Sequence, residues 1–334
     1  MKNIVLKLLC ITLVLASIFI VSCKQPENPP VIDPADEDGK FSIAILPDTQ
    51  QEVVIQEAIK NRLFAQRNEW LVSKMDERDI RFALHTGDVV NWGDVDESQL
   101  VIASDAMEVL DKAGIPVVYA LGNHDTAAVG VGGSAAVPSE TKTRVRDTSA
   151  FNKYFSTTRY PYLNVREENH IENAYALFEA CGVKWMVLTL ELWPRTEVIE
   201  WAKSVVSQHP RYNVIVITHS YLTANGDILT TNGGYGANSP EYLYNNLISC
   251  YDNIKMVFSG HTGSATARVN TTKNGNKIIN VLGCFHSNDN NPVRLVEIDV
   301  KNGTVEGEIF VPISDKKWTQ YCFYVDGMNF INPE

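Results

Sequence analysis

Five polar segments each follow a run of residues with the character of a buried strand, and this arrangement limits what the chain can fold into. The apolar runs are Ser42–Leu46, Arg81–Leu84, Val117–Leu121, Val214–Ile217 and Ile254–Phe258. The segments that follow them are Asp48-Thr49-Gln50, Gly87-Asp88 (with Asn91 shortly after), Gly122-Asn123-His124-Asp125, Thr218-His219 and Gly260-His261-Thr262. Side chains from several loops meet at the strand ends of open α/β sheets. Asp, Asn, Gln and His gathered there predict a site for divalent first-row metals.

The rest of the chain after residue 40 alternates helical and strand patterns. Apolar residues recur at helical spacing over Glu52–Lys74, Gln99–Ala113 and Glu197–Ser207. The segments with strand character are Tyr175–Phe178, Val183–Leu190, Tyr212–Ile217, Ala265–Asn270, Ile278–Leu282, Val293–Val300 and Thr304–Val311. Strand–helix alternation followed by hairpins predicts an α/β fold with two packed mixed sheets and helices outside them.

The first 22 residues are typical of an export signal. Lys2 and Lys7 flank the start of the apolar run Leu8–Ser22, which is followed by Cys23. Ile20–Cys23 resembles a bacterial lipobox, which implies cleavage before Cys23 and a membrane anchor through lipid on that cysteine. Lys24 favours the outer membrane by the same resemblance. The alternative is an ordinary signal peptide with an incidental cysteine.

Composition divides the remainder into a tether and one domain. Residues 23–40 are rich in Pro and acidic residues and predict a disordered tether, whereas residues 41–334 have globular composition. The four cysteines of the domain form no CxxC pair, so we expect buried free thiols. The net charge of −11 argues against a broad nucleic-acid-binding surface. It is compatible with a phosphorylated substrate, because bound cations reverse the sign locally. The sequence does not indicate an oligomeric state.

The ordered set of polar segments resembles the calcineurin-like metallophosphoesterase family over nearly all of the chain after residue 40. Pro47-Asp48-Thr49-Gln50 is similar to a known variant of the family's opening motif. The resemblance implies a four-layer α/β/β/α sandwich for 41–334. It also implies two divalent metal ions, with Mn, Fe, Zn, Mg and Ca as candidates.

By this resemblance, Asp88 bridges the two metals. Asn123, His219 and His261 complete a second metal site, which matches the family pattern at every position. The ordinary role of a lone strand-end histidine is a hydrogen-bonded structural one. Here, three residues fall together where the pattern needs them.

The first metal site departs from the pattern. The family usually has histidines at the positions of Gln50 and Gly263, so the resemblance leaves Asp48, Gln50 and Asp88 as ligands. This oxygen-only set favours Mn²⁺, Mg²⁺, Ca²⁺ or Fe²⁺ over zinc and predicts weaker binding than at the second site. His286 or water is a candidate to complete it.

The resemblance assigns the catalytic role to His124, which would contact a phosphoryl oxygen or protonate the leaving group. Many family members orient this histidine with an aspartate, where this chain has Asn91. We expect Asp125 to cap its own turn and His85 to pack in the core, with a role behind the ligands as the alternative. Arg159 is a candidate to line the cleft, although simple packing also explains it.

The expected function is hydrolysis of a phosphodiester or phosphomonoester by a metal-bridging hydroxide, with a slight preference for the diester. The alternative is a surface lipoprotein with an eroded metal site that binds a phosphorylated or glycan ligand without turnover.

Overall fold

The computed structural model describes residues 39–54, 61–286 and 289–332. The predicted signal, Cys23 and all but the last two residues of the tether lie outside these ranges. Among the described residues, none of the helices combines the length and apolar character needed to cross a bilayer.

The first sheet supplies three parallel strands that lead into polar segments. Its strands are β1 (Lys40–Leu46), β2 (Ile80–His85), β3 (Val117–Tyr119), β11 (Val293–Asp299), β12 (Thr304–Val311), β13 (Lys316–Lys317) and β14 (Phe323–Val325). They are ordered β13-β12-β11-β1-β2-β3, with β14 also paired to β12. The β1–β2 and β2–β3 pairs are parallel, whereas β11 and β12 are antiparallel to their neighbours.

The second sheet repeats this arrangement. Its strands are β4 (Asn164–Val165), β5 (Ala174–Ala180), β6 (Val183–Thr189), β7 (Asn213–Ile217), β8 (Ile254–Ser259), β9 (Ala265–Thr271) and β10 (Lys277–Gly283). They are ordered β4-β5-β6-β7-β8-β10-β9, and the run β6-β7-β8-β10 is parallel. Three parallel strands of this sheet, β7, β8 and β10, therefore also end in polar segments at one edge.

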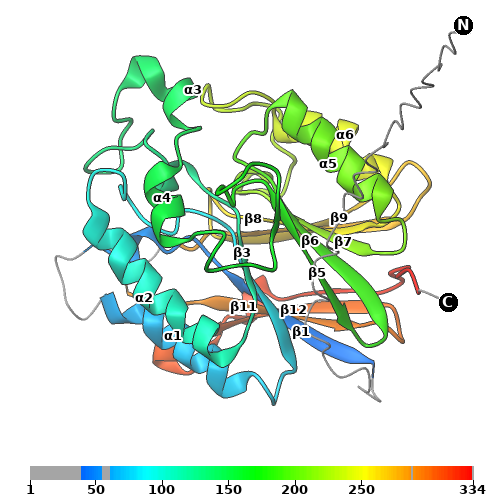
Figure 1. Cartoon of the computed structure of the whole chain (residues 1–334). Helices are drawn as coiled ribbons and strands as arrows, with labels where there is room; N and C mark the ends of the chain where they lie inside the picture. The colour runs from blue at the N-terminus through cyan, green and yellow to red at the C-terminus, as the bar shows by residue number, and fades with distance from the viewer. Residues whose placement is uncertain (1–38, 55–60, 287–288, 333–334) are drawn as a thin grey trace, which may run out of the picture.

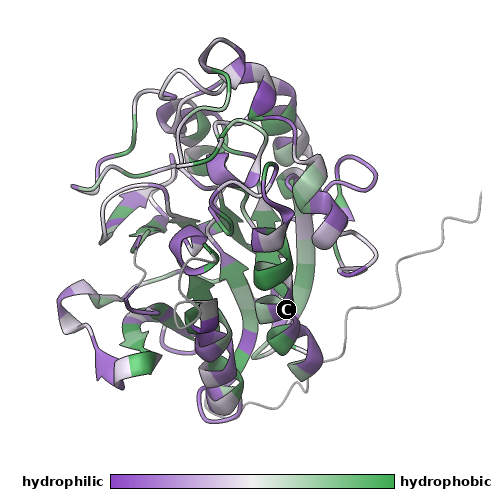
Figure 2. Ribbon diagram, turned by 90° about the vertical axis from the view of Figure 1, so that its left-hand side faces the viewer, coloured by the Kyte–Doolittle hydropathy of each residue, from purple (hydrophilic) through white to green (hydrophobic). Residues whose placement is uncertain are grey.

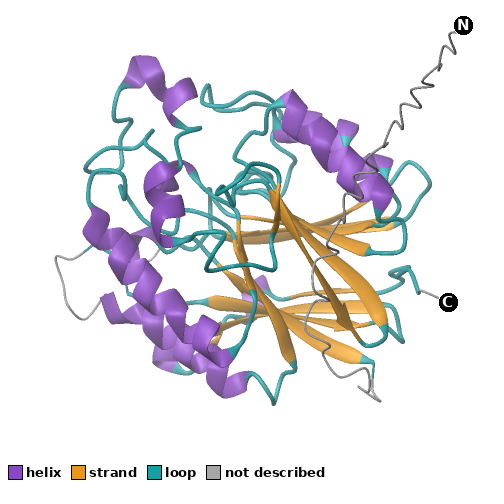
Figure 3. Cartoon of the chain, in the orientation of Figure 1, coloured by secondary structure: helices purple, strands orange, loops and turns teal. Residues whose placement is uncertain are grey.

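Helices cover the outer face of each sheet (Figures 1 and 3). They are α1 (Asn61–Lys74), α2 (Glu97–Ala113), α4 (Ser149–Tyr154), α5 (Thr196–Gln208) and α6 (Pro240–Asn246), whereas the short helix α3 (Thr141–Arg144) lies in the long segment between β3 and β4, away from the sheets. Short 3₁₀ turns are η1 (Gln50–Glu52), η2 (Asn123–Asp125), η3 (Pro138–Glu140), η4 (Ile248–Cys250), η5 (Pro312–Ser314) and η6 (Thr319–Tyr321). Helix α2 begins after the Asp96 cap, two residues before the predicted start at Gln99, and ends at Gly114 in the left-handed conformation.

Alternation along the strands explains the layers. In β1, Ala44 and Leu46 pack with α1 and α2, whereas Ile43 and Ile45 pack between the sheets. A third core lies between the second sheet and α5 and α6. The apolar strands lie inside and the more polar helix faces lie outside (Figure 2). The predicted four-layer α/β/β/α sandwich is confirmed.

Several predicted boundaries shift by one or two residues, and two of the changes lie next to the polar segments. Glu52, the first residue of the helix predicted over Glu52–Lys74, belongs to η1 instead, and α1 is described only from Asn61. Strand β3 ends at Tyr119 rather than Leu121, because the chain then turns into the Gly122 segment.

Candidate metal centre

The parallel strands of both sheets bring the predicted ligands to one edge. β1, β2 and β3 lead to Asp48, Asp88 and Asn123, and β7 and β8 lead to His219 and His261. Ligand atoms of Asp88, His219 and His261 lie within 4.8 Å of one another. The distant segments predicted to meet therefore do meet.

Asp88 is at the centre of this cluster and is only 1% exposed. Its Oδ2 atom accepts a 3.1 Å hydrogen bond from Gln50 Nε2 and lies 3.1 Å from His219 Nε2. Its Oδ1 atom accepts a 3.1 Å bond from the backbone N–H of His124. A Cβ on Gly87, whose φ is +102°, would lie 2.6 Å from His219 Nδ1. Glycine there permits the close approach of the two sheets.

The two histidines present nitrogen atoms to the cluster. His219 Nδ1 donates to the carbonyl oxygen of Thr86 at 2.8 Å, which directs Nε2 toward Asp88. His261 Nδ1 lies 3.1 Å from His219 Nε2, and the His261 backbone N–H donates to Asp48 Oδ2 at 2.9 Å. A carbonyl oxygen on the far nitrogen is the usual way in which a ligating imidazole is oriented.

Charges are unevenly distributed in the cluster. Burial opposes the charge on His219, but the Asp88 carboxylate raises the pKa of His219 to about 9. Burial likewise opposes ionisation of Asp88, but nearby histidines, His219 first, hold its pKa below the ordinary value. Burial, followed by the charge on His219, lowers the pKa of His261 to about 4. Asp88 and His219 therefore form a buried ion pair. A divalent metal bound between them would displace the proton on His219 Nε2.

Three oxygen atoms provide a test of whether metals fit here. Asp48 Oδ1, Gln50 Oε1 and Asn123 Oδ1 are buried and have no hydrogen-bond partner among the described residues. Buried oxygens without partners are costly and rare, and each such group requires an explanation. All three belong to the predicted ligand set, and carboxylate and amide oxygens are good ligands for divalent cations. The residues present fit a two-metal cluster.

His124 lies beside the cluster and is half-buried. Its Nδ1 atom donates to the backbone carbonyl of Asn91 at 2.7 Å, and the Asn91 side-chain oxygen has no partner within the described ranges. The loop after His124 folds back so that Gly133 lies next to both residues. The predicted interaction between Asn91 and His124 thus runs through the main chain.

Asp125 and His85 have structural positions. Asp125 accepts hydrogen bonds from the backbone N–H groups of Val90 (3.0 Å) and Gly122 (2.9 Å), which is the expected capping role. Burial and the Asp88 charge raise the pKa of Asp125 to about 8. His85 is fully buried and contacts Thr49 Oγ1 at 3.1 Å, directly behind the Asp48 segment.

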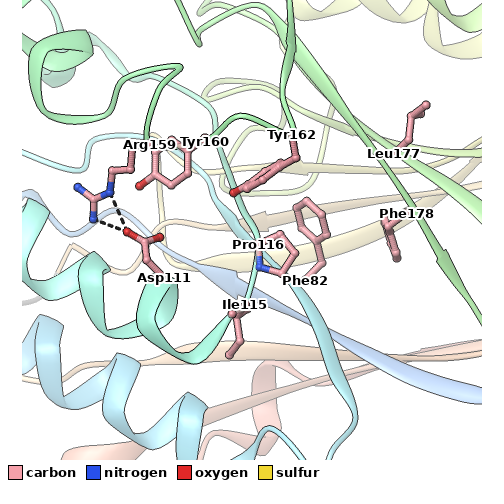
Figure 4. A pocket seen from close by; sticks show the side chains of 10 residues that line it. Phe82, Asp111, Ile115, Pro116, Arg159, Tyr160, Tyr162, Leu177 and Phe178 are labelled. Carbon is pink, nitrogen blue, oxygen red and sulfur yellow. Dashed lines mark hydrogen bonds and ion pairs between the residues drawn. The ribbon is translucent and has the colours of Figure 1, made fainter. Parts of the chain in front are cut away.

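The structure does not bring Arg159 to this edge. Arg159 pairs with Asp111 at the end of α2 and donates to Ser104, beside a separate cavity of about 190 Å³ (Figure 4). That cavity is lined mainly by apolar side chains near the start of β3, including Pro116 and Phe178. Packing and ion pairing satisfy the guanidinium. Sequence spacing alone does not show which end of β3 the 159 segment contacts.

Two further residues border the cluster. Cys284 and His286 lie against Asp48 from the end of β10, with Sγ and Nε2 at 3.2 and 3.1 Å from Asp48 Oδ2. The sequence suggests His286, but it predicts only a buried thiol at Cys284. Trp193 is not among the predicted residues: its ring stands perpendicular to that of His261 at 5.4 Å. No periodic or motif signal marks it.

The fold and this cluster define a class, the metal-dependent phosphoesterases. The family model described as calcineurin-like phosphoesterase matches residues 41–264, and the chain belongs to this family. Membership implies a dinuclear divalent-metal site.

Individual relatives are distant. The Bacillus subtilis (strain 168) protein YvnB, described as uncharacterized, is 28% identical over 209 residues, which are 61% of this chain and 14% of YvnB. The chain therefore matches only a small part of that relative. A dimetal phosphatase from Danio rerio is 10% identical, with a TM-score of 0.49 over 86% of this chain and 98% of that one. TT1561 of Thermus thermophilus has a TM-score of 0.40 at 10% identity over the same shares of the two chains.

Proposed function

We propose that this protein hydrolyses a phosphodiester, with Asp48, Gln50 and Asp88 at a first metal site and Asp88, Asn123, His219 and His261 at a second. The observation that carries the proposal is the set of three buried oxygens, on Asp48, Gln50 and Asn123, without partners among the described residues. Two divalent cations, when bound, neutralise charge on the phosphoryl group and activate water for attack.

The role of His124 follows from its contacts. Because a carbonyl oxygen can only accept, the bond to Asn91 places a proton on His124 Nδ1 and leaves Nε2 for the substrate. The backbone N–H of His124 is also tied to Asp88 Oδ1, which fixes the imidazole relative to the cluster. In the imidazolium form, Nε2 carries a second proton, and it is this proton that Nε2 would donate to a phosphoryl oxygen or give to the departing oxygen.

Two cavities support a diester rather than a monoester. One, of about 360 Å³, adjoins Asn123 and His261 and is lined by Trp193 and Tyr235. The other, of about 270 Å³, adjoins His286 and is lined by aromatic residues that include Trp318. A phosphodiester has two organic substituents, and each cavity can take one. A phosphomonoester would use only one cavity.

The walls of the first cavity are fixed. Arg146 donates to the backbone carbonyls of Leu192 (2.7 Å) and Trp193 (2.8 Å), and Trp193 has a left-handed φ of +44°. A Cβ on Gly236 would lie 2.2 Å from the Cβ of Trp193. These contacts position the Trp193 backbone, from which the ring extends to a place beside His261.

The experiment compares hydrolysis of bis-p-nitrophenyl phosphate and p-nitrophenyl phosphate with Mn²⁺ and after chelation. We expect metal-dependent turnover and a higher kcat/KM for the diester. Trp193→Ala and Trp318→Ala should each weaken diester hydrolysis, whereas the monoester should respond to at most one of them. Binding of the esters without turnover in the Mn²⁺-loaded protein would instead favour a ligand-binding lipoprotein with an eroded site.

A further inference from the structure

We propose that His286 is a ligand of the first metal site. The proposal rests on the proposed function, because it concerns the same cluster. Ligand atoms of Asp48, Cys284 and His286 lie within 4.8 Å of one another, and His286 Nε2 is 3.1 Å from Asp48 Oδ2. The other carboxylate oxygen of Asp48, Oδ1, is buried and has no hydrogen-bond partner in the described part of the chain. A cation bound here would supply that partner.

The backbone around Phe285 sets the direction of the His286 side chain. Phe285 has a left-handed φ of +53°, which is unusual for a bulky residue. Its ring packs against Trp318 and Tyr321 at centroid distances of 5.4 Å. Strained conformations of this kind persist where the surroundings hold them and are common at ligand sites. The consequence is that the residues on either side of Phe285 both face Asp48.

The neighbouring main chain reinforces this geometry. The Asp48 backbone N–H donates to the carbonyl oxygen of Cys284 at 3.1 Å, which joins the start of the first polar segment to the end of β10. The Cys284 thiol donates to Asp48 Oδ2 at 3.2 Å. Cys284 therefore orients the carboxylate, and the imidazole of His286 supplies the additional lone pair.

Gly263 explains why a ligand from another segment is needed. A Cβ at Gly263 would lie 2.8 Å from the Cβ of Ala224, and its φ of +67° disfavours any side chain. Gly263 cannot contribute a ligand, and it lines the same cavity as His286. With His286 added, the first site has one nitrogen and three oxygen-bearing side chains, a set suited to Mn²⁺, Fe²⁺ or Co²⁺.

The test measures metal binding rather than turnover. Metal-free wild type and His286→Ala are titrated with Mn²⁺ by equilibrium dialysis, and imidazole nitrogens coupled to Mn²⁺ are counted by pulsed electron paramagnetic resonance. We expect wild type to bind two equivalents. His286→Ala should keep the tighter one and bind the other at least about tenfold more weakly, with loss of an imidazole signal from that site.

His170→Ala is the matched control. His170 is also partly exposed (38%, against 43% for His286) and contacts a carboxylate oxygen, that of Glu172, at 2.9 Å. It should leave both affinities unchanged. Two equivalents bound by His286→Ala with wild-type affinities and spectra would overturn the proposal. Absence of metal binding by wild type would instead overturn the proposed function, so the two failures are distinguishable.

Discussion

His124 is held through the main chain of Asn91: its Nδ1 atom lies 2.7 Å from the Asn91 carbonyl oxygen. A backbone carbonyl is fixed by the fold and carries no full charge. It therefore orients the imidazole without stabilising an imidazolium as a carboxylate would. His124 is consequently an oriented hydrogen-bonding group whose contribution depends on the leaving group.

The first prediction concerns His124→Ala. Because no side-chain atom of His124 belongs to the proposed ligand set, the variant should retain both metals. Turnover should fall by about 10²–10⁴-fold for esters with poor leaving groups and much less for p-nitrophenolate, which needs no protonation. Rates across a series of aryl and alkyl diesters, with metal content measured in parallel, check this. Loss of metal, or an equal rate loss for every leaving group, would contradict the assigned role.

Asp88→Asn should act on the metals themselves. The substitution removes the negative charge shared by the cluster and the partner of the His219 imidazole. We expect reduced metal content and loss of turnover. Asp125→Asn is the control, since this nearby buried acid contacts backbone N–H groups rather than the ligands. The metal content of both purified variants is measured. An Asp88→Asn protein that holds both metals would exclude a bridging role for Asp88.

The buried pair between Arg67 and Glu52 should be essential for stability. Both side chains are at most 1% exposed, and Arg67 also donates to the carbonyl of Pro292 at 2.9 Å. Arg67→Met leaves the Glu52 carboxylate buried without its cation, and we expect a loss of about 3–5 kcal/mol in the free energy of unfolding. Urea denaturation measures this. Adding Glu52→Leu to Arg67→Met should recover part of the loss, and failure to do so would mean that packing, not charge, dominates.

Lys255 predicts a pH dependence of stability. Burial lowers the pKa of Lys255 from 10.5 to about 8. Between these values the unfolded chain binds more protons than the folded one, so stability rises with pH, by at most about 1.4 kcal/mol per pH unit. Lys255→Met should remove this contribution. The variant should be more stable than wild type at pH 7, and this difference in stability should shrink as the pH rises from 8 to 10.5. Lys273→Met, at an exposed lysine, should show no such trend in denaturation at several pH values.

Lipid attachment at Cys23 remains a prediction from sequence. In a bacterial host, Cys23→Ser should remove lipid incorporation and release the protein from membranes or leave it unprocessed. Cys10→Ser, at the other leader cysteine, should still be lipidated. Metabolic labelling with a fatty acid analogue, followed by membrane fractionation, checks both variants. A soluble wild-type protein that begins elsewhere would refute the anchor.

Local pattern is sufficient to predict the layers and the edge of the sheets at which most of the proposed ligands meet. Apolar runs followed by polar residues identify strands that end at a shared edge, and the family resemblance orders the segments. The same information could not place Arg159, since both ends of β3 were open to it. It also could not show that His124 would contact the main chain of Asn91 rather than its side chain, because that depends on the turn between β2 and α2.

The sequence also could not predict which residues surround the proposed first metal site. His286 follows β10, and its approach to Asp48 depends on the pairing of β10 with β8 and on the left-handed Phe285. Neither is a local property. Trp193 likewise lies beside His261 in a loop whose backbone contacts Arg146, a residue distant in the sequence.

The proposed ligands come from both sheets: Asp48, Asp88 and Asn123 follow strands of one, and His219 and His261 follow strands of the other. Bound cations would therefore link the two sheets of the sandwich at the edge where these residues meet, which we call the seam. Without them, Asp48 and Asp88 are buried carboxylates, and the charges that oppose theirs in the described part of the chain are on histidines. Occupancy of the metal centre would then govern how firmly the two halves of the molecule hold together, and amide exchange at the seam would report it.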